Sequence, residues 1–208
     1  METRRFENLQ YVIRFPKVYD ENKKYPVILF LHGAGLRGKD ITPMYGNKFF
    51  ELTEQHTPFD FVCVAPLCEE TCWFDVFEQV KRFADHIYNQ SYTDKSRFYG
   101  MGNSMGGYAT WQLAMSKPEL FSAIVPICGG GMYWNVGRLK DIPVWAFHGA
   151  LDTTVLSRES EILVERLNNS GGNAKLTIFP DVKHDSWIPV YENKEVFEWL
   201  LSNVKGEQ

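Results

Sequence analysis

The sequence lacks the features of membrane-spanning and nucleic-acid-binding proteins. No segment approaches the roughly 20 consecutive apolar residues that a membrane-spanning helix needs. The chain has 22 Lys and Arg against 26 Asp and Glu, a formal net charge of −4, and no long basic block. A surface that follows phosphates or anionic lipids is therefore not expected. We expect no nucleic acid and no membrane as partner, and small neutral or mixed-polarity molecules fit better.

A secretory signal and a disulfide framework are not expected either. The opening residues, METRRFENLQYVIRF, are charged early and lack the apolar core of about 7 to 15 residues that a secretory signal requires, so we expect a cytoplasmic location. Only four cysteines occur, and most lie within or beside apolar runs, as buried free thiols do. No second Cys/His pair joins Cys68 and Cys72 to complete a zinc pattern, so we expect no metal. Whether these two thiols pair remains open.

Repeats, low-complexity segments and linkers are also missing. A chain of 208 residues, 44% hydrophobic, can bury one substantial core and is short for two. We therefore expect one domain over residues 1–208. The sequence leaves the oligomeric state open, with a homodimer as one alternative.

Short β-rich runs alternate with helical patterns along the chain. Strands are predicted at 9–15, 26–32, 59–65, 96–102, 121–127, 143–149 and 174–180. Helices are predicted at about 74–90, 105–117, 157–169 and 193–203. Several strands are apolar without clean alternation, which is typical of parallel strands covered on both faces. The pattern predicts an α/β fold with a mostly parallel sheet of about seven strands and helices on both faces.

One serine lies among four glycines in RFYGMGNSMGGYATW, residues 97–111. The Gly-x-Ser-x-Gly pattern around Ser104 is short and weak by itself, but it falls between a predicted strand and a predicted helix. That is the context of a nucleophile elbow, in which a strained turn raises the serine hydroxyl above the sheet edge. Side chains at Gly102 and Gly106 would clash with the neighbouring strand and helix. A glycine-rich packing turn is the alternative reading.

A serine hydroxyl needs a histidine base and an acid that orients it. FHGALDTTV places Asp152 just after a predicted strand, and FPDVKHDSW places His184 just after the next one. The loops after parallel strands converge on one edge of the sheet, so Ser104, Asp152 and His184 can meet there. Asp181 and Asp185 flank the histidine too closely to orient it. A solvated carboxylate and a surface histidine are the alternatives.

An apolar strand runs into a glycine-rich loop in LFLHGAGLRG. Backbone N–H groups of such a loop can face a bound carbonyl oxygen. We expect Ala34 or Gly35 to supply one oxyanion donor and Met105, at the N-terminus of the helix after Ser104, to supply the other.

With these motifs in order, the chain resembles α/β-hydrolases of the small carboxylesterase, dienelactone hydrolase and polyhydroxyalkanoate-depolymerase-like grouping, near the esterase branch of prolyl-oligopeptidase-like serine hydrolases. LHGAG, GNSMGGYATW, FHGALDTTV and KHDSW carry the resemblance, which covers roughly residues 10 to 203. It implies a Ser-His-Asp triad, an acyl-enzyme intermediate, water as acceptor and no cofactor.

Two departures from the family pattern bear on the site. Lys183 replaces the usual glycine before the histidine, and only residues 128–142 separate the strands ending near Ile127 and starting at Pro143. That connection has no room for a cap domain. We expect an open site with residues 68–73 and 129–134 as its rim. Trp73, Trp187 and Trp134 are candidates for substrate binding, although large aromatics beside glycine loops more often serve packing.

The leading functional hypothesis is hydrolysis of carboxylic esters, either short-chain or carbohydrate-linked acyl and hydroxycinnamoyl esters. Two alternatives remain: a serine peptidase of prolyl-oligopeptidase type, and a non-catalytic protein that binds a small molecule in a hydrolase pocket.

Overall fold

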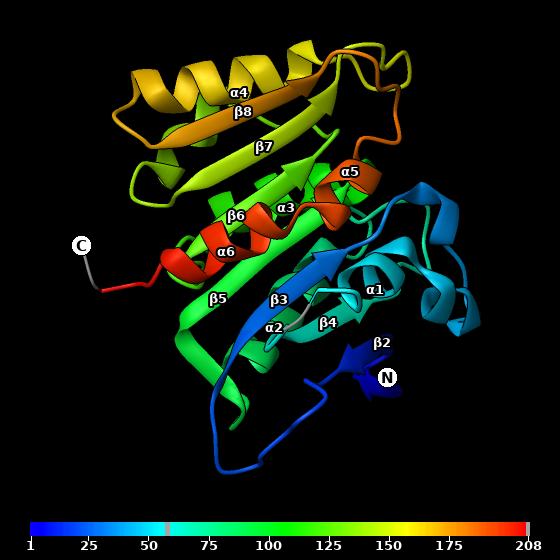
Figure 1. Cartoon of the computed structure of the whole chain (residues 1–208). Coiled ribbons are helices and arrows are strands. Elements are labelled where there is room, and N and C mark those ends of the chain that lie inside the picture. The colour runs from blue at the N-terminus through cyan, green and yellow to red at the C-terminus, as the bar shows by residue number, and fades with distance from the viewer. Residues whose placement is uncertain (57–58, 207–208) are drawn as a thin grey trace.

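One mixed β-sheet organises the computed structural model, which describes residues 1–56 and 59–206 (Figure 1). Its strands are β1 (Glu2–Phe6), β2 (Leu9–Arg14), β3 (Tyr25–Leu31), β4 (Val62–Pro66), β5 (Thr93–Asn103), β6 (Ala123–Ile127), β7 (Val144–Gly149) and β8 (Ala174–Phe179). Their order across the sheet is β1-β2-β4-β3-β5-β6-β7-β8. Strand β2 is antiparallel to both of its neighbours, and the pairs from β4 to β8 are parallel.

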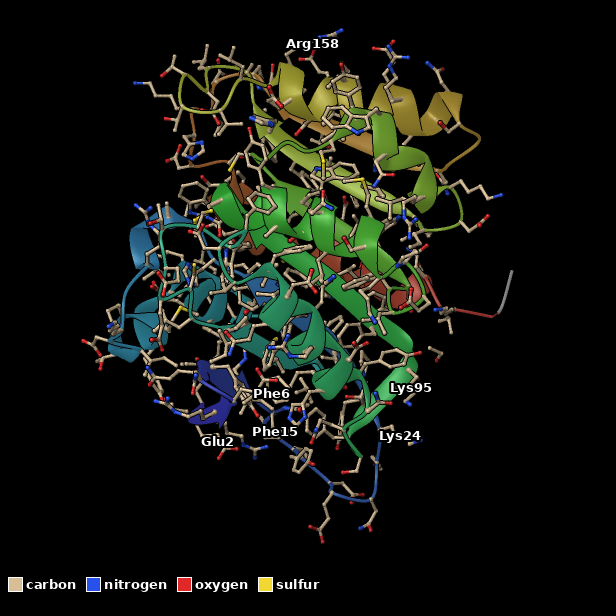
Figure 2. The ribbon with its side chains drawn as sticks, turned by 180° about the vertical axis from the view of Figure 1, so that it is seen from behind. Glu2, Phe6, Phe15, Lys24, Lys95 and Arg158 are labelled. Carbon is tan, nitrogen blue, oxygen red and sulfur yellow. The ribbon has the colours of Figure 1, made fainter. Side chains whose placement is uncertain are left out.

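Helices cover both faces of this sheet. The α-helices are α1 (Lys48–Thr53), α2 (Phe77–Tyr88), α3 (Met105–Ser116), α4 (Arg158–Asn169), α5 (Trp187–Glu192) and α6 (Lys194–Ser202). The 3₁₀ segments are η1 (Ala34–Leu36), η2 (Thr42–Gly46) and η3 (Tyr133–Leu139). Helices α2, α3 and α4 pack on one face, which Figure 2 shows toward the viewer. Helices α1, α5 and α6 pack on the other, toward the viewer in Figure 1.

Each face of the sheet has its own hydrophobic core. The first core contains buried side chains such as Phe83, Trp111 and Leu163 from the helices on that side. The second contains Phe49 and Phe197 with Phe30 of the sheet, whose ring is stacked on that of Phe49 at a centroid distance of 4.2 Å. The central strands β3, β4, β6 and β7 are buried along their whole length, which explains why their sequences do not alternate.

The predicted fold is confirmed, and the seven predicted strands and four predicted helices are present with shifted ends. The strand count was low by one, because β1 carries three charged residues and is largely exposed at the edge, so it lacks an apolar pattern. Helices α1 and α5 were also missed. Each has only six residues, which is too short for a clear helical period, and Pro189 lies inside α5.

The topology brings the functional motifs to one edge of the sheet. Strands β3, β5, β6, β7 and β8 are parallel, so their carboxyl ends point the same way, with Leu31 beside Gly102 and Asn103 beside Ile127. The connection between β6 and β7 contains only η3 and no cap domain. Within the described residues, no helix combines the length and apolarity that crossing a membrane requires.

Candidate active site

Ser104 occupies a strained turn between β5 and α3. Its φ of 55° and ψ of −120° are rare for a residue with a side chain. The turn is held on both sides, because the Ser104 N–H donates to the Ile127 carbonyl at 2.9 Å and the Tyr108 N–H donates to the Ser104 carbonyl at 3.0 Å. The predicted nucleophile turn is therefore present in the backbone.

Glycine is required on both sides of the serine. A Cβ at Gly102 would overlap the Gly106 carbonyl, and a Cβ at Gly106 would overlap the Leu31 carbonyl of β3. The strand, the turn and the helix can therefore approach one another only when these positions have no side chain. The steric reason expected from the sequence is confirmed.

The three residues predicted to act together lie in hydrogen-bonding contact. His184 Nε2 lies 2.8 Å from Ser104 Oγ, and His184 Nδ1 lies 2.7 Å from Asp152 Oδ2. Asp152 follows β7 and His184 follows β8. The serine is thus 80 residues from the histidine in the chain, and the shared sheet edge closes this separation.

Asp152 is held as an ionised acceptor. Burial acts to raise the pKa of its carboxyl group, but the hydrogen bond from His184 and the backbone N–H groups of Val155 and Thr154 outweigh burial, and the pKa lies below its ordinary value. These two N–H groups donate to Oδ1 at 2.9 Å each. The carboxylate therefore has a fixed orientation and can stabilise a positive charge on His184.

The glycine-rich loop after β3 begins with η1. The N–H groups of Leu36 and Arg37 donate to the carbonyls of Gly33 and Ala34. The N–H groups of Ala34 and Gly35 precede this 3₁₀ bonding, as do the first N–H groups of any helix. Met105 is the first residue of α3, so its N–H is also outside the helical ladder. Their role as oxyanion donors stays a prediction.

A second loop, residues 68–73, braces this glycine-rich loop. His32 accepts a hydrogen bond at Nε2 from the Cys68 N–H at 3.0 Å, and Arg37 donates to the Thr71 carbonyl at 2.7 Å. Burial lowers the pKa of His32 to about 4, so this histidine is neutral and structural. Cys68 and Cys72 are both free thiols, which answers the question of their pairing for this structure.

Trp73 also belongs to the brace, and its predicted role in substrate binding is wrong. Its side chain is fully buried in the core, and its Nε1–H donates to the His32 carbonyl at 3.0 Å. A residue without exposed surface cannot contact a bound ligand. Its burial follows from its place under the glycine-rich loop, which the sequence does not reveal.

A pocket of about 500 Å³ opens beside Ser104 and His184. Its further lining residues are Gly33, Ala34, Gly35, Leu36, Gly46, Asn47, Lys48, Asn103, Thr154, Trp187 and Tyr191. Trp187, the second tryptophan proposed from sequence, lies edge-on to the His184 ring at a centroid distance of 5.5 Å. Of the three tryptophans, this one has the predicted position.

Neither predicted rim segment lines this pocket. Trp134, on η3, is 73% exposed and packs edge-on against Tyr133 outside the pocket. Part of the wall is formed instead by residues 46–48, at the junction of η2 and α1. These residues are not among those expected from the sequence. The sequence signals only the start of α1 here, because Asn47 caps this helix by accepting from the Phe49 N–H at 2.9 Å, and an Asn before KFFEL is a helix-start pattern.

A serine turn after the central strand β5, with its acid and its histidine arriving later along the chain at the same sheet edge, is the arrangement that defines α/β-hydrolases. The chain has the α/β-hydrolase fold.

Comparisons with known proteins add detail to this class. The Prolyl oligopeptidase family matches residues 75–135. The chain is similar to the probable feruloyl esterase C of Aspergillus niger, with 26% identity over 173 residues, which are 78% of this chain and 62% of that protein. It is also similar to dipeptidyl-peptidase 5 of Porphyromonas gingivalis, with 21% identity, covering 96% of this chain and 36% of that protein.

Among solved structures, a thermostable esterase superposes with a TM-score of 0.83 at 32% sequence identity. The match covers 98% of this chain and 62% of that one. The chain thus spans 62% of the length of each of these two esterases.

Proposed function

We propose that this chain is a serine esterase that hydrolyses carboxylic esters through an acyl-enzyme intermediate. One observation carries the proposal: the unbroken contact from Ser104 Oγ through His184 to Asp152, with distances of 2.8 and 2.7 Å, on a strained serine turn. A packing serine has no need of a histidine and a buried carboxylate in line with it. The same contact argues against a non-catalytic binding protein.

The reaction would proceed in two steps, acylation of Ser104 and hydrolysis of the acyl-enzyme. In the first, Ser104 Oγ attacks the ester carbonyl carbon while His184 Nε2 accepts the hydroxyl proton and then gives it to the departing alcohol. In the second, His184 takes a proton from water, the resulting hydroxide attacks the acyl carbon, and the proton returns to Ser104 as the acid leaves. Asp152 stabilises the imidazolium, and the N–H groups of Met105 and Ala34 or Gly35 would bind the oxyanion.

Hydroxycinnamoyl or other acyl esters attached to carbohydrate are the substrate class that we favour. A pocket of about 500 Å³ can accept a ligand with an aromatic ring, and Trp187 offers a ring face or edge to it. The β6–β7 connection contains no cap domain that could cover the pocket, so a bulky alcohol group could remain outside the pocket. The similarity to feruloyl esterase C supports the same class.

A serine peptidase of prolyl-oligopeptidase type is the second candidate. The match of residues 75–135 to that family and the similarity to dipeptidyl-peptidase 5 favour it. An amide is cleaved by the same triad when the leaving amine is protonated, so the triad does not discriminate between the two reactions.

Two measurements test the proposal. A fluorophosphonate probe should label the folded native chain at Ser104, and p-nitrophenyl acetate should be hydrolysed by the native chain but not by Ser104→Ala. Absence of labelling on folded protein would contradict any serine hydrolase activity of this chain. Methyl ferulate, an acetylated sugar and an N-acylated aminoacyl anilide should then be compared. The highest kcat/KM should be found for an ester, and a clear preference for the anilide would favour the peptidase.

A further inference from the structure

A buried thiol lies close to two residues of the proposed triad. Cys128 Sγ, a carboxylate oxygen of Asp152 and one ring nitrogen of His184 all lie within 4.8 Å of one another. They come from three different strand ends, those of β6, β7 and β8. The proposed hydrolysis uses Asp152 and His184, and the thiol of Cys128 takes no part in it.

Cys128 is fixed in this position by its backbone. It follows β6 directly, has a φ of 40°, and donates its N–H to the Phe147 carbonyl at 2.8 Å. Its side chain is fully buried. Burial raises the pKa of the thiol to about 12, although the Ser104 amide and the Ser186 hydroxyl counter part of the rise. The thiol is therefore neutral and is not a nucleophile by itself.

Ser186 adds a second and independent observation. Its hydroxyl group is fully buried beside the Cys128 thiol, and within the described residues it has no other hydrogen-bonding partner. A thiol is a weak hydrogen-bonding partner, so this buried hydroxyl is poorly satisfied by the chain alone. The Ser186 hydroxyl thus lies at the sulfur end of the group formed by Cys128, Asp152 and His184.

We propose that Cys128, Asp152 and His184, with the Ser186 hydroxyl beside them, form an inhibitory site for a zinc-type divalent cation. Thiolate, imidazole and carboxylate are the protein ligands that Zn²⁺ prefers. Two anionic ligands would make the buried cation electrically neutral overall. A tetrahedral zinc ion with bonds of about 2.0 to 2.3 Å separates its ligands by about 3.3 to 3.8 Å, so the side chains need to move by only about 1 Å.

The bound cation would inhibit hydrolysis because it changes which nitrogen of His184 carries the proton; this step rests on the proposed function. His184 Nδ1 is the nitrogen beside Asp152, so a cation between these residues binds Nδ1. The imidazole proton then lies on Nε2, and the thiol proton is released to solvent. His184 Nε2 can no longer accept the proton of Ser104, which lies 2.8 Å away. The cation and the catalytic tautomer therefore exclude each other.

Cobalt spectroscopy on the whole chain tests the site without any activity. One equivalent of Co²⁺ should produce the visible bands of a tetrahedral ion and a thiolate-to-cobalt charge-transfer band. Both should persist in Cys72→Ser, which removes the partly exposed thiol, and the charge-transfer band should disappear in Cys128→Ser and Cys128→Ala. Absence of these bands from the native chain would overturn the proposed site, whether or not the variants fold. Persistence of the charge-transfer band in a folded Cys128 variant would overturn it as well.

Zn²⁺ titration of ester hydrolysis tests the inhibition. With each variant compared with its own zinc-free rate, the half-inhibitory concentration should rise at least about tenfold in Cys128→Ser and stay at the native value in Cys72→Ser. Equal sensitivity of native chain and Cys128→Ser would overturn the proposal. A chain that binds Co²⁺ as expected but hydrolyses no ester would contradict only the proposed function.

Discussion

At the scale of single residues, the orientation of one imidazole ring decides whether Ser104 can react. Asp152 accepts the Nδ1 proton of His184 and thereby leaves Nε2 free to act as a base. Asp152→Asn keeps the shape but offers an amide that can donate to Nδ1, which favours the wrong tautomer. We expect kcat for p-nitrophenyl acetate to fall about ten-thousand-fold. A folded Asp152→Asn variant that stays within about tenfold of native would show that another group is the acid.

The same carboxylate makes stability depend on pH. Hydrogen bonds hold the pKa of Asp152 below its ordinary value of 3.8 in spite of burial, so the folded chain binds a proton less readily than the unfolded chain. The stabilisation is complete above that ordinary value and is lost as the pH falls through the lower, folded value. Urea unfolding of native chain and Asp152→Asn should therefore differ most near neutral pH and converge in acid. A gap that stays constant down to the acid limit would contradict this linkage.

At the scale of elements, close packing of β5, the serine turn and α3 depends on two glycines. A Cβ at Gly106 would overlap the Leu31 carbonyl, and the backbone of β3 cannot move without breaking its ladder to β5. We expect Gly106→Ala to lower the free energy of unfolding by at least about 3 kcal/mol, measured by urea denaturation. Gly46→Ala is the control, because its Cβ meets nothing within 4 Å and stability should change little.

The brace formed by residues 68–73 is a second element with a testable role. Trp73→Phe keeps a ring in the core but leaves the His32 carbonyl without its donor, which should cost about 1 to 2 kcal/mol of stability. Because the brace holds the proposed oxyanion loop, we also expect a lower kcat with KM little changed.

Trp145→Phe is the matched control for the brace. It loses a similar hydrogen bond, from Nε1 to Thr177 Oγ1 at 2.9 Å, on strands β7 and β8 and away from the oxyanion loop. Its stability should fall by a comparable amount while kcat stays native. Equal kcat values for the two variants would show that the brace does not position the loop.

At the scale of the whole molecule, the two cores share one sheet and should unfold together. Leu163 on α4 and Leu200 on α6 are fully buried on opposite faces. Replacing either with Ala should cost about 2 to 5 kcal/mol, and each variant should still unfold in one transition by circular dichroism and by fluorescence. Two separated transitions in either variant would contradict the single domain expected for residues 1–208.

Much of the fold and of the site's centre could be predicted because their signals are local in the chain. Ser104 lies between glycines at a strand-to-helix change, and Asp152 and His184 each follow an apolar run. The pocket wall could not be predicted in the same way. Residues 46–48 reach the pocket from the long connection between β3 and β4, and no local pattern reports such a distant approach.

The three tryptophans show where sequence reasoning ends. Trp73, Trp134 and Trp187 are all candidates by residue type and by nearness to a motif. Trp73 is buried and belongs to the brace, Trp134 is exposed outside the pocket, and Trp187 lies beside His184. These outcomes depend on contacts between segments far apart in the chain.

The sequence by itself determined the class of fold, the order of the strands along the chain and the residues at the centre of the site. Strand and helix periodicity, and the glycines around Ser104, are properties of neighbouring residues. Only the tertiary structure decided which groups surround that centre, including the thiol of Cys128 close to Asp152 and His184. The physical reason is that parallel strands from distant parts of the chain end at one edge of the sheet, and their loops meet only once the sheet has formed.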